Sequence, residues 1–150
     1  MTELRELYQQ IILDHNKNPR NFGKLDGANH TQEGYNPLCG DHLNIYLHID
    51  KERITDIRFE GSGCAISKAS ASLMTDTLKG KAVTEAIEIF EQFHTMVTAD
   101  VNTPVDEISL GKMAVFAGVR EFPMRVKCAT LAWHTMKAAV KEDQTPVSTE

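Results

Sequence analysis

The chain has 150 residues, of which 41% are hydrophobic, and a formal net charge of −5 at pH 7. This length and composition fit a single compact domain, which we expect at residues 1–141, and leave too little apolar sequence for a second core. The negative charge disfavours nucleic acid as a partner, and there is no uninterrupted apolar run near the ~18 residues that a membrane-spanning helix needs.

The cysteines and the N-terminal segment indicate a cellular compartment. Three cysteines without close pairs argue against a disulfide framework, and the N-terminal segment is charged and amphipathic, unlike a signal peptide. We therefore expect a protein of the reducing cytoplasm. The polar stretch at residues 142–150 is predicted to be a disordered tail.

The first predicted element is an amphipathic helix over about residues 3–14. Its apolar residues recur at helical spacing, namely Leu4, Leu7, Ile11 and Ile12. Thr2 is a suitable N-cap residue for this helix. The polar run from Asp14 to Asn21, interrupted by Pro19, is predicted to be a loop.

The middle of the chain has the clearest strand pattern. A weak signal suggests a short strand within residues 28–34. Apolar and polar residues alternate over 43–49 and again over 57–60, on either side of a charged turn at 50–53. This pattern is typical of a β-hairpin with one buried face.

Helices dominate the rest of the sequence. A helix follows Cys64, with Ile66, Ala69, Leu73 and Leu78 at helical spacing, and ends at Gly80. Another is predicted from Thr84 to about His94, followed by a loop over 98–104 and a short apolar piece over 113–117. Pro123 suits the first turn of a last helix, which reaches about Lys141, with Val126, Trp133, Met136 and Val140 as candidate core residues.

The candidate functional residues are the three cysteines and one acid. Cys39 and Asp41 are two positions apart, so in extended chain their side chains face the same way. Cys64 follows Cys39 after 24 intervening residues and Cys128 follows after another 63, so only a tertiary fold could bring them together. Three thiolates and a carboxylate would suit Zn²⁺, or iron with sulfide, but the cysteines could equally be small buried hydrophobic residues.

Two details bear on this hypothesis. Cys64 lies after Gly61-Ser62-Gly63 at the start of a predicted helix, where free amides and the helix dipole favour a thiolate. Arg125 puts positive charge in the first turn of the last helix, three residues before Cys128. An anionic cluster nearby would compensate that charge, although a solvated surface arginine is the equally weighted alternative.

Taken together, these segments resemble the U-type iron–sulfur cluster assembly proteins over nearly the whole chain. The matching pieces are Asp14-His15, Asn18-Pro19-Arg20-Asn21-x-Gly23, Asn36-Pro37-x-Cys39-Gly40-Asp41, Phe59-x-Gly61-x-Gly63-Cys64-Ala65-Ile66-Ser67, Ala69-Ser70-Ala71-Ser72 and Arg125-x-x-Cys128. The resemblance implies an α+β fold of the SufE/NifU type, a small antiparallel three-stranded sheet packed against several helices. It also implies that the cysteines and Asp41 meet at one exposed tip.

The resemblance is closest to the SufU branch. The IscU branch has a histidine directly before its last cysteine and a Leu-Pro-Pro-Val-Lys segment, where this chain has Lys127 and the segment 121–125, and its stretch between the last two cysteines looks shorter. The SufU likeness implies a zinc-dependent sulfur acceptor that works with a SufS-like cysteine desulfurase and the iron–sulfur assembly machinery. By this likeness Cys39, Asp41, Cys64 and Cys128 would bind zinc, Cys39 would take the sulfur, and Arg125 would assist.

Three other functions remain as alternatives. The same residues could hold a [2Fe–2S] cluster on a scaffold that passes it on, or the zinc could be purely structural. A Cys–His hydrolase is less favoured, because His15, His42 and His134 each have an ordinary explanation as loop, strand or helix residues and no nucleophile elbow is present in the sequence. Whether the chain is an enzyme in its own right is left open.

Overall fold

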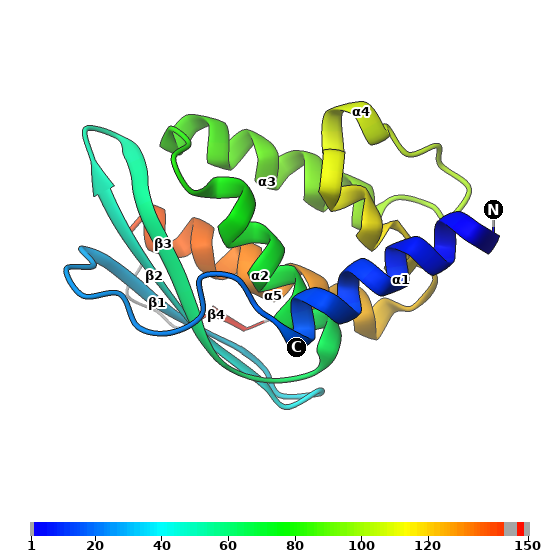
Figure 1. Ribbon diagram of the computed structural model, residues 1–150, viewed down its shortest axis with the longest axis horizontal. Helices are drawn as coiled ribbons and strands as arrows, with labels where there is room; N and C mark the ends of the chain where they lie inside the picture. The colour runs from blue at the N-terminus through cyan, green and yellow to red at the C-terminus, as the bar shows by residue number, and fades with distance from the viewer. Residues whose placement is uncertain (1, 143–146, 149–150) are drawn as a thin grey trace.

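The computed structural model describes residues 2–142 and 147–148 and shows an α+β fold with its main helices on one face of a sheet (Figure 1). In chain order the elements are α1 (Thr2–Lys17), β1 (His30–Asn36), β2 (Asp41–Asp50), β3 (Arg53–Ser62), α2 (Ala65–Leu78), α3 (Val83–Thr98), α4 (Glu107–Leu110), the 3₁₀ helix η1 (Gly111–Glu121), α5 (Pro123–Val140) and β4 (Val147–Ser148). None of the described helices is long and apolar enough to cross a membrane.

The sheet has four strands in the order β3-β2-β1-β4. The predicted antiparallel arrangement of three strands is present, but a fourth strand, β4, pairs in parallel with β1 through Gly34 and Tyr35. The three-stranded prediction was therefore wrong by one strand, because a two-residue strand has no alternation that a sequence pattern could reveal. Both β4 residues belong to the tail predicted to be disordered; residues 143–146 and 149–150 of that tail lie outside the described residues.

The predicted hairpin is formed by β2 and β3. Side chains along β2 alternate between buried and half-buried positions, with Leu43, Ile45 and Leu47 facing the core. The tight turn consists of Lys51 and Glu52, both with positive φ angles (51° and 61°). Two such residues give the turn a twist that matches the paired strands, and the hairpin register carries Asp41 to the opposite end of β2 from this turn.

Helices α2 and α5 form the layer next to the sheet, and each begins near a cysteine. Trp133 of α5 is fully buried, and its indole N–H donates to Ser70 Oγ of α2 at 3.1 Å. Ser70 Oγ in turn donates to the carbonyl of Ala129 at 2.6 Å. Close packing continues at Gly34 of β1, where an added Cβ would lie 2.1 Å from Thr135 Oγ1 of α5. These contacts hold the two helices and β1 in a defined relation.

Some helix boundaries differ from the prediction. Helix α1 continues to Lys17, so the loop begins just before Pro19, because the residue preceding a proline disfavours helical geometry. Helix α3 runs on to Thr98, and the short apolar piece at 113–117 lies within η1. The last helix is close to its predicted bounds; Trp133 and Met136 are fully buried, and Val126 and Val140 pack against the core.

Candidate metal centre

Cys39 and Asp41 lie at the hairpin connection between β1 and β2. The strands pair up to Asn36 and Asp41, so residues 37–40 form a four-residue connection. Gly40 has a φ of 72°, a conformation that side chains other than glycine's rarely adopt. Cys39 is half-buried on this connection, whereas Asp41 is only 2% exposed.

Cys64 reaches the same place from the end of β3. It is the N-cap residue of α2, and its Sγ accepts a hydrogen bond from the backbone N–H of Ser67 at 3.4 Å. Its own backbone N–H donates to Asp41 Oδ1 at 2.8 Å. The other Asp41 oxygen, Oδ2, lies 3.9 Å from Cys64 Sγ, so the carboxylate bridges the start of β2 and the start of α2.

Cys128 completes the cluster from the second turn of α5. Its thiol is buried (2% exposed), and the ligand atoms of Cys39, Asp41 and Cys128 all lie within 4.8 Å of one another. Cys64 joins this group through Asp41, because its Sγ lies 3.9 Å from Asp41 Oδ2, although it is not among the atoms that all lie within 4.8 Å of one another. Three segments distant in the chain therefore converge, as the hypothesis required.

This donor set fits a divalent cation. Burial raises the pKa of the Cys128 thiol well above its ordinary value, and its neighbours Cys39, Cys64 and Asp41 raise it further. Without a cation this thiol stays protonated, whereas a bound cation reverses that preference and stabilises thiolates. Three sulfur donors and one oxygen match the number and softness of donors in tetrahedral zinc sites, and thiolates also hold iron–sulfur clusters.

Asn36 is a site residue that the sequence analysis did not single out. It is fully buried at the end of β1, and its Nδ2 lies 3.4 Å from Cys128 Sγ and 3.5 Å from Asp41 Oδ2. Its Oδ1 is buried without a hydrogen-bond partner among the described residues. The available signal was its place in Asn36-Pro37-x-Cys39, but sequence alone does not show that its amide faces the thiols.

Arg125 and the histidines make other contacts. The exposed Arg125 guanidinium lies over the Phe122 ring, 4.4 Å from its centroid. His15 is buried with Nδ1 2.7 Å from Ser72 Oγ, and burial lowers its pKa. His42 Nε2 lies 3.0 Å from Glu33 Oε2, and the His134 ring packs edge-on against Phe90. These contacts give the three histidines local structural roles.

Fold and site together define a small α+β protein that gathers three thiols and one carboxylate at one end of its sheet. Residues 7–129 match the family described as the NifU-like N terminal domain. The chain belongs to this family.

Named relatives cover almost the whole chain. It is 42% identical over 141 residues to the "Iron-sulfur cluster assembly scaffold protein IscU" of Streptococcus pyogenes serotype M1, a match that covers 94% of this chain and 87% of the relative. It is 40% identical over 141 residues to the "Zinc-dependent sulfurtransferase SufU" of Bacillus subtilis strain 168, covering 94% of each chain.

A solved structure agrees with the fold. A crystal structure from Fervidobacterium islandicum AW-1, of a candidate iron–sulfur cluster assembly scaffold for the SUF system, matches with a TM-score of 0.81 and 37% identity. The match covers 91% of this chain and 98% of the other. Similarity of this extent supports the same arrangement of helices and strands in both proteins.

Proposed function

We propose that this protein binds zinc through Cys39, Asp41, Cys64 and Cys128 and accepts sulfur from a cysteine desulfurase for iron–sulfur cluster assembly. The observation that carries the proposal is the convergence of three thiols on one buried carboxylate. The relative named as a zinc-dependent sulfurtransferase supports the choice of metal and of chemistry.

Cys39 is the best candidate to receive the sulfur. It is half-buried on a connection that contains Pro37 and Gly40, whereas Cys128 is buried within a helix. In the transfer, the Cys39 thiolate attacks the outer sulfur of the desulfurase persulfide, Cys–S–SH. A new S–S bond forms at Cys39, the old S–S bond breaks, and its electron pair leaves with the desulfurase cysteine as a thiolate. The step needs no external oxidant or reductant.

The other residues would hold and balance the site. Zinc, when bound, keeps thiolates deprotonated at neutral pH without redox chemistry of its own. Asp41 is the hard oxygen donor, fixed by the Cys64 amide, and Cys64 and Cys128 are the anchored sulfur donors. Arg125 would offset part of the negative charge of three thiolates and a carboxylate as the partner approaches.

Two departures from the IscU branch favour a SufS-like desulfurase as the partner, and the unpaired cysteines favour the cytoplasm as the location. Lys127, where the IscU branch has histidine, leaves the position before Cys128 without an imidazole that could bind the metal. The segment between α3 and α5 contains α4 and η1, in the region that looks longer than in the IscU branch. Both features resemble the SufU branch.

A desulfurase assay on the full chain tests the proposal. The native protein should contain zinc, stimulate the desulfurase and gain the mass of one sulfur atom at Cys39. Cys39→Ala should abolish the stimulation and the mass gain, whereas Ser62→Ala, an exposed change at the end of β3, should retain both. A Cys39→Ala protein that accepts sulfur at the native rate would refute the assignment.

A scaffold function is the second candidate, because the relative of 42% identity is named as a cluster assembly scaffold. The same four residues could hold a [2Fe–2S] cluster as cargo, since clusters bind thiolates with occasional other donors. Anaerobic reconstitution with iron and sulfide separates the two candidates. A scaffold turns coloured and transfers the cluster, whereas a zinc sulfur acceptor stays colourless and keeps its zinc.

A further inference from the structure

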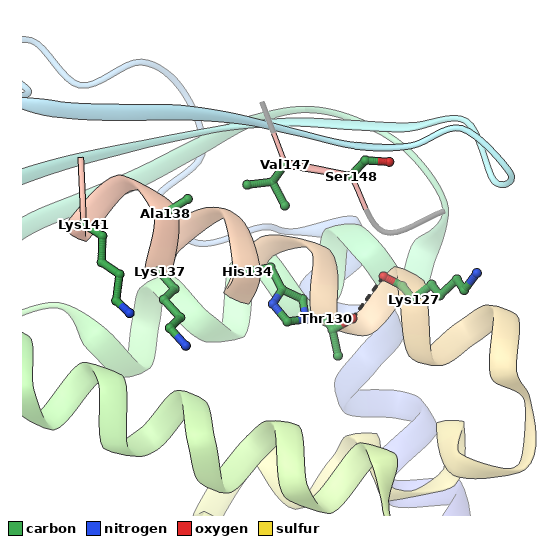
Figure 2. A pocket seen from close by; sticks show the side chains of 8 residues that line it. All are labelled: Lys127, Thr130, His134, Lys137, Ala138, Lys141, Val147 and Ser148. Atoms are coloured by element: carbon green, nitrogen blue, oxygen red, sulfur yellow. Dashed lines mark hydrogen bonds between the residues drawn. The ribbon is translucent and has the colours of Figure 1, made fainter. Parts of the chain in front are cut away.

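A basic groove runs along α5 and starts next to the proposed metal ligand Cys128. It encloses about 470 Å³ and is lined by Lys127, Thr130, His134, Lys137, Ala138, Lys141, Val147 and Ser148. Figure 2 shows the six lining residues of α5 and its C-terminal end in order along the helix, with Val147 and Ser148 of β4 beside it. The lining thus combines three lysines and a histidine with apolar surface that includes Ala138 and Val147.

The groove has a defined shape because neighbouring elements support its lining. His134 packs against Phe90 of α3, with ring centroids 5.3 Å apart. The Lys137 ammonium lies 5.0 Å from the centre of the Phe90 ring and 3.5 Å from Glu91 Oε1. The lining spans residues 127 to 141, which corresponds to about 21 Å of helix. A segment of about six extended residues would cover this length.

Helix α5 itself carries positive charge without any acidic residue. The whole chain carries −5, yet the sequence from Pro123 to Lys141 contains no aspartate or glutamate. Among residues 2–142 and 147–148, Lys127 and Lys141 form no ion pair, so their charges are available to a partner. An acidic partner would be repelled by much of the molecule and attracted here, which would fix its orientation.

The position of the groove indicates which partner would use it. Lys127 immediately precedes Cys128, so the groove starts at the helical turn that carries a proposed metal ligand. A protein lying along the groove would have its next contacts beside the thiol cluster. The desulfurase that donates the sulfur must reach the thiol cluster. It is therefore the partner that best fits a surface made of the groove and the cluster together.

We propose that the α5 groove binds a short acidic segment of the cysteine desulfurase and so orients the donor toward Cys39. This inference rests on the proposed function for the identity of the partner. Because the contacts are charged and partly exposed, they should act mainly on affinity and association rate, and they should weaken as salt increases.

Matched charge variants of the full chain test this proposal. The groove variant is Lys127→Glu/Lys137→Glu/Lys141→Glu. The control is Lys17→Glu/Lys24→Glu/Lys51→Glu, three exposed lysines at the end of α1, in the following loop and in the β2–β3 turn. Both variants have the same net charge. Affinity for the desulfurase is measured by titration at low and high salt, alongside stimulation of its activity.

The groove variant should bind the desulfurase at least about tenfold more weakly at low salt, while the control binds within about twofold of the native protein. At saturating concentration, the groove variant should still stimulate the desulfurase to the same maximal activity as the native protein. Because Lys137→Glu would place a second carboxylate beside Glu91 and could disturb folding, a second pair of variants is compared: Lys137→Gln/Lys141→Gln and, as its control, Lys24→Gln/Lys51→Gln. Lys137→Gln/Lys141→Gln should also bind the desulfurase more weakly than its control, by a smaller factor than the groove variant.

The outcomes separate this inference from the proposed function. Equal affinity of the groove and control variants, with native stimulation present, would overturn the groove proposal and leave the sulfur-acceptor function standing. Native protein that binds through the groove but gives no stimulation would leave docking intact and refute sulfur transfer. Preferential binding of a short oligonucleotide, lost only in the groove variant, would assign the groove to nucleic acid and overturn the proposal.

Discussion

The carboxylate of Asp41 and the backbone N–H of Cys64 are joined by a hydrogen bond of 2.8 Å. This single contact connects the start of β2 to the N-terminus of α2, two elements separated in sequence by all of β3. It fixes one carboxylate oxygen and leaves the other, Oδ2, 3.9 Å from Cys64 Sγ. The orientation of the oxygen donor is therefore determined by the backbone of a neighbouring sulfur donor.

Gly63→Ala should disturb this arrangement. A Cβ at residue 63 would lie 2.4 Å from Asp41 Oδ1 and 3.0 Å from Asp41 Cγ, so the buried carboxylate would have to move. We expect zinc affinity to fall by about tenfold or more, as for other changes that misalign metal ligands. Competition with a chromophoric chelator measures this affinity.

Gly118→Ala is the matched control, because a Cβ there meets nothing within 4 Å and its φ is not positive. It should leave zinc affinity and sulfur acceptance unchanged. Native zinc affinity in Gly63→Ala would show that the position of Asp41 is unimportant for the metal.

Asn36→Ala should weaken the site without removing a proposed ligand. The change deletes the amide that approaches both Cys128 Sγ and Asp41 Oδ2, and such supporting contacts typically change metal affinity by about 10- to 100-fold. Asn44→Ala, in the half-buried outer row of β2, serves as the control. If both variants bound zinc equally well, Asn36 would have only a packing role.

Ser70→Ala should destabilise the packing of the two cysteine-bearing helices. It leaves the buried indole N–H of Trp133 without its acceptor and removes the hydrogen bond to the Ala129 carbonyl, a cost of about 1–3 kcal/mol. Chemical denaturation of the metal-free protein measures the effect. Thr95→Ala, at an exposed position of α3, should change stability by less than about 0.5 kcal/mol. Equal stability of the two variants would contradict this account of the interface.

Zinc affinity should fall as the pH is lowered. Burial, and after it the neighbouring Cys39, Cys64 and Asp41, raise the pKa of Cys128, so at neutral pH the metal-free thiol holds a proton that zinc must displace. Each displaced proton makes affinity fall about tenfold per pH unit. Calorimetric titrations of zinc into the protein, in buffers of different ionisation enthalpy, count the protons released per zinc bound. Proton release below one per zinc at neutral pH would mean that Cys128 is not a thiolate ligand.

Local order could be predicted well from the sequence. The alternation over residues 43–49 and 57–60 predicted the hairpin and its buried face, and Gly80 and Pro123 marked helix ends. The boundary error at Lys17 and the missed strand Val147–Ser148 arose where local pattern is short or absent. Periodicity shows only which residues share a face, and a strand of two residues is too short to have a periodic pattern.

By itself, the sequence determined which residues could form a metal site, because three cysteines and the nearby Asp41 are a restricted set of soft and hard donors. Only the tertiary structure decided that they meet, since the 24- and 63-residue separations of the cysteines exceed what local structure can bridge. Only the fold shows that the buried amide of Asn36 faces Cys128, that Asp41 leaves no room for a side chain at Gly63, and that α5 lines a basic groove. Each of these depends on packing between elements distant in the chain, where distances are set by side chains of several segments together.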